Sequence, residues 1–313
     1  MKLKNLIEIA IAGQKDGYPK DPLPNFVFTR DNILTLHNSI FLPTMTKKAR
    51  KRENFLVKFV LSNSPLFNKF FAGDFTPNQN DTFEGGDFLL IDEETIFIGI
   101  SDRTTIGFVR KFADYLFKKN NAIKTIVGIR VELKHERSMH LDTYMGVIGD
   151  YIIVFDEPLV TSNDNTFYVF KRESNNSPEL FLGNFDMLLQ KINKNENFEV
   201  IHVSEKREAY DDACNVLSIN KNQIITYDRG AKTVKKLGER GFTKIIYCFD
   251  DKNKGIWKKF ILENDEWQLQ DQFDKLIDFY KKDGQYVFEI EGSELILARG
   301  GCHCMSMPLE RIH

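Results

Sequence analysis

Cysteine is scarce in this sequence: four stand among 313 residues, at positions 214, 248, 302 and 304. So few cysteines exclude a small secreted scaffold stapled by disulfides. No apolar run is long enough to form a transmembrane helix. The first four residues are followed by Asn, Glu and Gly rather than by a signal-peptide core with a small-residue cleavage site. We therefore expect a reduced, cytoplasmic protein with no membrane partner.

An excess of positive charge is also absent. The chain has 43 Lys and Arg against 45 Asp and Glu, which gives a net charge of −2 and a pI near 6.3. A chain with this balance has no general basic field that would attract nucleic acid or an anionic membrane. The basic run at residues 47–52 is typical of a solvated helix face. We therefore predict no nucleic acid partner.

Apolar residues, by contrast, are plentiful enough for a large core, at 42% of the chain with 27 phenylalanines. We assign residues 1–313 to a single domain, which a chain of this length can form. The order strand–strand–helix–strand is clear over residues 88–131 and returns more loosely over 143–203 and 215–249. Repeated modules of this kind bury a shared core when they stack. An α/β fold with one ordinary mixed sheet is the alternative that periodicity leaves open.

The predicted elements outside these modules are a helix over 3–12, strands over 25–29 and 33–42, a helix over 47–61 and a last strand over 286–290. The segment 250–284 interrupts the alternation, because it is highly charged and contains both tryptophans, Trp257 and Trp267. We expect this segment to form one or two helices inserted on the surface of the domain.

Near its end the chain carries Cys302-His303-Cys304 directly after Gly300 and Gly301. A zinc site would need a second pair of Cys or His ligands, and Cys-x-Cys is an unusual ligand spacing. A thiol oxidoreductase would carry Cys-x-x-Cys. A cysteine nucleophile needs a base and an electrophile held by partner groups. The polar residues elsewhere in the chain can supply these, so the nucleophile is the favoured hypothesis.

Polar side chains cluster where predicted strands end, as functional residues of α/β folds commonly do. They are Asn25, Arg30, Asp31, Arg50, Glu84, Asp87, Arg103, His140, Asp142, Arg299, His303 and Cys304. Each also has a purely structural interpretation. An Asp that follows a strand is usually a turn or cap residue, and Glu84-Gly85-Gly86-Asp87 reads equally well as a plain turn.

Six sequence blocks in order nevertheless resemble those of the arginine deiminase family, guanidine-modifying enzymes of the pentein superfamily. The blocks are 22–31, 49–53, 83–87, 99–104, 139–143, and 299–301 together with 304–309. The resemblance implies a pentein-type α/β propeller of repeated strand–strand–helix–strand modules. It also implies that part of the first module is missing, because the family has an additional section before the block at 22–31.

The resemblance further implies roles for individual residues. Cys304 would be the nucleophile and His140 the general acid and base, with Glu84 hydrogen-bonding in the same pocket. Asp31 and Asp142 would hold the guanidinium group through charge-assisted hydrogen bonds. The substrate's α-carboxylate and aliphatic chain would be held by Asn25, Arg50, Arg103 and Phe28, and the loop residue Arg299 would open and close the site. Cys302 would be a bystander, and no metal or cofactor is implied.

The implied reaction is hydrolysis of L-arginine to L-citrulline and ammonia through a covalent amidino intermediate on cysteine. One alternative is a non-catalytic or regulatory relative that binds guanidines without turnover. Another is a hydrolase of a related substrate such as citrulline or a methylated arginine. Agmatine is disfavoured, since Asn25, Arg50 and Arg103 indicate a free α-carboxylate. A homo-oligomer is possible.

Overall fold

A computed structural model describes residues 14–15, 18–19, 23, 25–72, 75–119, 122–130, 140–174, 177–249, 255–273, 284–292 and 300–307. The helix predicted over residues 3–12 and the site residue Arg299 lie outside these ranges. Within them, each helix is too short or too polar to cross a membrane.

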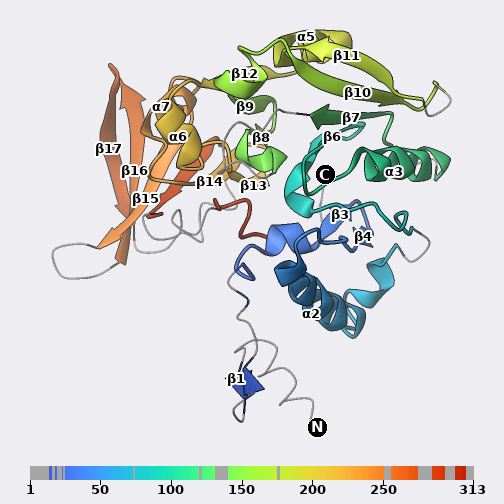
Figure 1. Ribbon diagram of the computed structural model, residues 1–313. Coiled ribbons are helices and arrows are strands. Elements are labelled where there is room, and N and C mark those ends of the chain that lie inside the picture. The colour runs from blue at the N-terminus through green and yellow to red at the C-terminus, as the bar shows by residue number, and fades with distance from the viewer. Residues whose placement is uncertain are drawn as a thin grey trace.

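The described residues form three larger sheets and two small hairpins (Figure 1). The five-stranded sheet has the order β11-β10-β7-β6-β5, and the three-stranded sheet the order β12-β9-β8. The six-stranded sheet has the order β13-β14-β18-β15-β16-β17. The hairpins are β1-β2 (Gln14–Lys15 and Tyr18–Pro19) and β3-β4 (Leu34–Leu36 and Ser39–Phe41). In Figure 1 the sheets follow one another around the molecule, and the C-terminal segment returns between the last sheet and the first elements.

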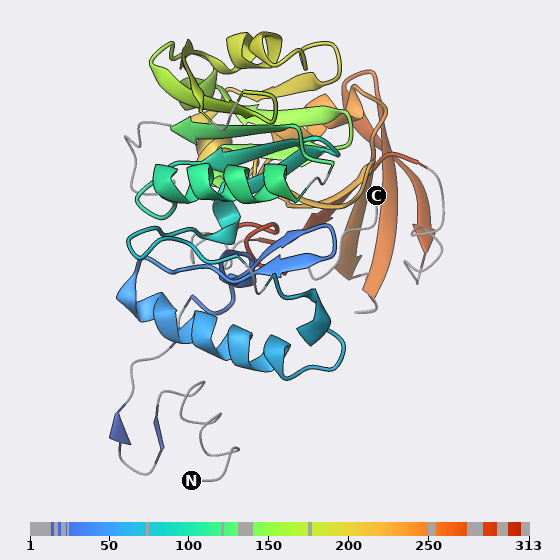
Figure 2. The ribbon, with the colours of Figure 1, turned by 90° about the vertical axis from the view of Figure 1, so that its right-hand side faces the viewer.

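The first predicted module is confirmed. It consists of β5 (Phe88–Asp92), β6 (Thr95–Gly99), α3 (Ile106–Lys118) and β7 (Thr125–Arg130). The helix begins after Thr105, whose side chain accepts a hydrogen bond from the backbone of Phe108. Its apolar stripe is buried, and Figure 2 shows α3 across the outer face of the strands. Because β6 and β7 pair in parallel, the helix is the crossover between them.

The elements of the later modules are confirmed. The second module has one antiparallel and one parallel strand pair, as the first has, whereas in the third module another strand lies between the two that would pair in parallel. The second contains β8 (Met145–Ile148), β9 (Tyr151–Phe155), α5 (Phe185–Lys191) and β12 (Glu199–Val203). The third contains β13 (Leu217–Asn220), β14 (Gln223–Tyr227), α7 (Ala231–Gly238) and β15 (Thr243–Phe249). The last strand, β18 (Tyr286–Ile290), lies between β14 and β15 and pairs in parallel with both. Four of its five residues are buried, which suits a central position in the sheet.

Some elements were not predicted. The strands β10 (Asn165–Lys171) and β11 (Glu179–Gly183) extend the first module's sheet beyond β7. Two short helices, α4 (Asp156–Leu159) and α6 (Lys206–Tyr210), follow the strands β9 and β12.

The expectation of helices in segment 250–284 is wrong over residues 255–273. This part forms a hairpin of β16 (Gly255–Glu263) and β17 (Glu266–Phe273), which continues the six-stranded sheet beyond β15. Asn264 and Asp265 connect the strands with φ angles of 47° and 66°. A two-residue turn with positive φ at both positions matches the twist of an antiparallel hairpin and selects Asn and Asp.

The expected strands near the start are also partly wrong. Residues 25–29 form tight turns in which the backbone N–H of Phe28 donates to the carbonyl of Asn25, and they lead into the 3₁₀ helix η1 (Thr29–Asn32). Residues 33–42 form the hairpin β3-β4, because His37 adopts a φ of 48° and reverses the chain. The predicted helix over 47–61 is confirmed as the 3₁₀ turn η2 (Lys48–Arg50) and α2 (Lys51–Ser62).

One buried carboxylate supports the third module. The helix α7 starts after Gly230, which has no side chain to cap it, and Glu208 of α6 accepts hydrogen bonds from the backbone N–H groups of Lys232 and Thr233 at 2.7 and 3.0 Å. We expect Glu208→Ala to lower the free energy of unfolding by about 1–2 kcal/mol, since it removes a helix cap. Urea unfolding measures this. Glu205→Ala, which removes an exposed ion pair with Lys232, should change stability little, and equal losses in the two variants would contradict the capping role.

Candidate active site

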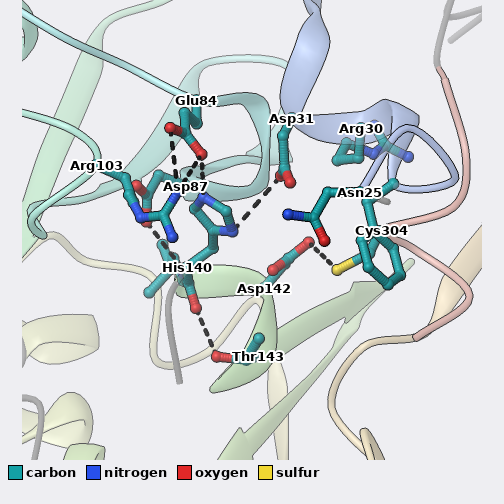
Figure 3. A network of polar contacts seen from close by, with 12 residues as sticks. Asn25, Arg30, Asp31, Glu84, Asp87, Arg103, His140, Asp142, Thr143 and Cys304 are labelled. Atoms are coloured by element: carbon teal, nitrogen blue, oxygen red, sulfur yellow. Dashed lines mark hydrogen bonds and ion pairs between the residues drawn. The ribbon is translucent and has the colours of Figure 1, made fainter. Parts of the chain in front are cut away.

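Segments far apart in the sequence bring polar side chains to one place (Figure 3). Their sources are η1, the residue before η4 (Gly85–Asp87), the loop after β6, the start of η5 (Leu141–Thr143) and the C-terminal loop. These side chains surround a cavity of about 50 Å³. The cavity is lined by Asn25, Phe28, Asp31, Arg50, Arg103, His140, Thr143 and Cys304.

His140 lies at the centre of the buried charges. Its Nε2 is 3.0 Å from Oε2 of Glu84, and its Nδ1 is 3.5 Å from Oδ1 of Asp31. Burial lowers the pKa of His140, but the charges of Asp31, Asp87 and Glu84 and the hydrogen bond to Glu84 outweigh it and raise the pKa to about 10. The ring is therefore an imidazolium at neutral pH, with a proton to give.

This protonation predicts a pH-dependent stability. Below the unfolded pKa both states hold the proton, and the stabilisation is lost as the pH rises through the folded pKa. For His140 the window runs from 6.5 to about 10. We expect the free energy of unfolding to fall across this window, and to fall less steeply in His140→Gln. Urea unfolding at several pH values measures both slopes, and equal slopes would contradict the assignment.

Two arginines neutralise the carboxylates around His140. Arg103 Nη1 lies 3.3 Å from Oε2 of Glu84, and Arg50 forms ion pairs with Asp31 and, at 2.8 Å, with Glu53. Burial raises the pKa of Glu84, but the hydrogen bond with His140 and the charges of His140 and both arginines hold it below its ordinary value. Arg50 thus orients Asp31, a function that the sequence did not indicate.

Cys304 lies beside the second buried aspartate. Its Sγ is 3.5 Å from Oδ2 of Asp142, and the same oxygen is 2.8 Å from Nδ1 of His303. Burial and the charges of Asp142 and Asp31 raise the pKa of Cys304 well above its ordinary value. For Asp142, burial acts to raise the pKa, but the hydrogen bond from His303 and nearby positive charges lower it. The resting pair is therefore a neutral thiol that donates to a carboxylate.

Two carboxylate oxygens in the site are left without a hydrogen bond. Oδ1 of Asp31 and Oδ1 of Asp142 are buried and have no hydrogen-bond partner within the described part of the chain. A buried acceptor without a donor costs free energy, so such atoms commonly serve a ligand. Oδ1 of Asp31 forms an ion pair with His140, at 3.5 Å from Nδ1, without a hydrogen bond. The site thus offers two anionic acceptors to a ligand that carries N–H donors.

Close backbone contacts hold the side chains of the site in place. A Cβ on Gly86 would lie 2.7 Å from Oδ1 of Asp31 and 2.9 Å from Cγ of His140, so a glycine is needed there.

Arg30, to which the sequence analysis gave no role, binds the C-terminal loop. Its backbone N–H donates to the carbonyl of Cys304, and its Nε donates to the carbonyl of His303. Asn215, which the sequence did not single out, contacts the same loop.

The predicted site residues that the structure describes all meet. Seven of them line the cavity, and Glu84 and Asp142 contact lining residues, whereas Arg299 lies outside the described residues. Ligand atoms of Asp31, Glu84 and His140 lie within 4.8 Å of one another, close enough for a metal ion. Arg50 and Arg103 already pair with these carboxylates, so the absence of a metal stays our prediction.

The family model and the curated relatives that match this chain name the same family. The family model for arginine deiminase matches residues 10–311. The arginine deiminase of Streptococcus gordonii is 27% identical over 299 residues, and that of Borrelia garinii subsp. bavariensis is 28% identical over 308. Each alignment covers 93% of this chain but 62% of the relative. The chain thus spans about three fifths of the length of these curated relatives.

Solved structures establish the fold. The substrate-bound N-terminal domain of ArgZ, an arginine dihydrolase from the ornithine–ammonia cycle in cyanobacteria, superposes with a TM-score of 0.59 at 19% identity, covering 94% of this chain and 79% of that one. DDAH from Pseudomonas aeruginosa, in complex with citrulline, gives 0.55 at 15% identity over 90% and 76%. The fold class expected from the sequence, a pentein-type α/β fold, is therefore confirmed.

Proposed function

Because the chain belongs to the arginine deiminase family, we propose that it hydrolyses the guanidinium group of L-arginine to L-citrulline and ammonia. The observation that carries the proposal is the pair of buried oxygens on Asp31 and Asp142 that have no hydrogen bond within the described residues and lie beside an imidazolium and a thiol. A guanidinium is planar and positive and presents several N–H donors, so it suits two such acceptors.

The substrate would lie with its guanidinium between Asp31 and Asp142. Arg103, Arg50 and Asn25 line the same cavity and would bind the α-carboxylate, and Phe28 would pack on the aliphatic chain. Binding of a cation offsets the two carboxylates that disfavour the thiolate, so the pKa of Cys304 falls when substrate is present. The nucleophile is then formed where the electrophilic carbon is held.

The chemistry has two halves. The Cys304 thiolate attacks the guanidinium carbon, and His140 donates its proton to a departing nitrogen, which leaves as ammonia. The product is an amidino group bound to sulfur through a C–S bond. His140, now neutral, takes a proton from water, whose oxygen adds to the same carbon. The C–S bond breaks and citrulline is released. The hydroxyl proton that the product oxygen then loses replaces the one that the Cys304 thiol gave to solvent when the thiolate formed, so the thiol is restored. Acid–base help of this kind contributes roughly 10²–10⁴-fold.

An ammonia-release assay on a panel of substrates tests the proposal. We expect turnover of L-arginine and none of agmatine, which lacks the carboxylate that Arg103 would bind. Ammonia release from citrulline, or release of a methylamine from a methylated arginine, without turnover of L-arginine would mean that the protein acts on that substrate instead. Calorimetric binding of arginine with no ammonia release would support the alternative that the protein is a non-catalytic guanidine-binding relative.

Three further expectations belong to this proposal. The chain acts as one catalytic domain, it can assemble as a homo-oligomer, and it works in the cytoplasm. The curated relatives are longer, so the activity of this chain has to be measured on the chain itself. Light scattering beside the ammonia assay determines whether the active species is a monomer or an oligomer.

A further inference from the structure

Asn215 lies two residues before β13, is 1% exposed, and is 89 residues from Cys304, which it contacts. Its side-chain Oδ1 accepts from the backbone N–H of Cys304 at 3.0 Å. Its Nδ2 donates to Sγ of Cys304 at 3.3 Å and to the carbonyl of Asp142 at 2.9 Å. Its backbone carbonyl accepts from the N–H of His303 at 3.2 Å. One side chain thus touches the backbone and the sulfur of the candidate nucleophile.

The orientation of this amide follows from its partners. The backbone N–H of Cys304 can only donate, so the amide oxygen has to face it. The carbonyl of Asp142 can only accept, so the amide nitrogen has to face that group. With the nitrogen placed, one of its two N–H groups points at Sγ. The flipped amide would set donor against donor and acceptor against acceptor.

We propose that Asn215 is a positioning residue that fixes the direction of the Cys304 sulfur and stabilises its thiolate by an N–H···S hydrogen bond. The proposal rests on the proposed function only in that Cys304 is the nucleophile. In the resting state the thiol proton is shared with Asp142, 3.5 Å away, and Sγ accepts from Asn215. Once the proton leaves, the carboxylate repels the sulfur and the amide donor remains.

The electrostatics explain why such a donor is needed. Cys304 is buried, and the charges of Asp142 and Asp31 both act against ionisation of its thiol. A bound guanidinium is attracted to those carboxylates and relieves that repulsion, whereas the amide of Asn215 acts on the sulfur directly. Gly301 completes the arrangement, since a Cβ there would lie 2.5 Å from Oδ1 of Asn215. Without a side chain at Gly301, the C-terminal loop can pack against the Asn215 amide, and the backbone N–H of Cys304 can reach its Oδ1.

The test is the pH profile of Cys304 alkylation by iodoacetamide, followed by mass spectrometry of the Cys304 peptide. This readout needs no turnover of arginine. Asn215→Asp keeps the shape and the acceptor for the Cys304 N–H but replaces the donor with an anion. We expect its profile to move up by about one pH unit, so that alkylation at a fixed pH below the midpoint is about tenfold slower. Asn215→Leu, which loses the donor without adding charge, should move the profile in the same direction by less.

The matched control is Asn165→Asp, which alters a buried amide that donates to the carbonyls of Pro158 and Ser162 away from the site. It should lower the melting temperature and leave the Cys304 profile unchanged. Unchanged profiles in folded Asn215 variants would overturn the proposal. If neither variant folds, the side-chain amide resonance of Asn215 in the wild-type protein should shift as Cys304 titrates, and a resonance that stays fixed would overturn it. A shifted profile without arginine turnover would keep the proposal and remove the proposed function.

Discussion

Cys304→Ala is expected to reduce ammonia release from arginine by at least about 10⁴-fold, since losing a covalent nucleophile removes the reaction path itself. Cys304 lines the cavity with its Sγ beside Asp142, and no other cysteine of the described residues lines it. Arginine binding should change only a few-fold, because the carboxylates remain. Stopped assays give the rate, and calorimetry gives the affinity of the inactive variant.

Cys302→Ser is the matched control, and it should keep turnover close to that of the wild type. Cys302 is buried outside the lining of the cavity, and burial and the charge of Asp212 raise its pKa to about 12. It is therefore a thiol at neutral pH with no access to the substrate. Rapid quench and mass spectrometry should find the amidino adduct on Cys304. An adduct on Cys302, or turnover that survives in Cys304→Ala, would contradict the assignment.

Most residues of the candidate site were predicted from the sequence, because they lie in short blocks of recognisable type. Asp31, Glu84 and His140 were predicted to lie together, and His140 contacts both carboxylates. Asn215 was missed because nothing in its neighbourhood distinguishes it from other asparagines that precede strands. Its importance arises from a contact across 89 residues, and such contacts are not encoded in local pattern.

In the fold, too, elements with a local sequence pattern were predicted, whereas pairings between distant segments were not. The stripe of α3 and the two strands before it were predictable because burial on one face imposes a period. The hairpin β16-β17 was mistaken for helix because its strands are rich in charge and pair at the edge of a sheet. The Asn264-Asp265 turn was the signal that could have corrected this. The placement of β18 between β14 and β15 depends on non-local pairing, which sequence pattern does not specify.

Asp142→Asn should lower arginine turnover by about 10³-fold, since electrostatic groups aimed at the reacting centre have effects of this size. The change removes one of the two anionic acceptors, the unpartnered Oδ1, and replaces a charge with a dipole. It also brings N–H donors where the guanidinium would need acceptors. Steady-state ammonia release measures the loss, which should appear in both kcat and KM.

The same substitution should affect the thiol of Cys304 in the opposite direction. The Asp142 carboxylate is 3.5 Å from Sγ, and its charge raises the pKa of Cys304. Without that charge the thiolate fraction at neutral pH should increase, and iodoacetamide should alkylate Cys304 about tenfold faster. Asp156→Asn, which alters a carboxylate paired with His202 away from the site, should change neither rate. A variant that merely disturbs the loop would slow both reactions, and that outcome would contradict the role of Asp142. Slower turnover on a more reactive thiol is the result that separates guanidinium binding from general damage.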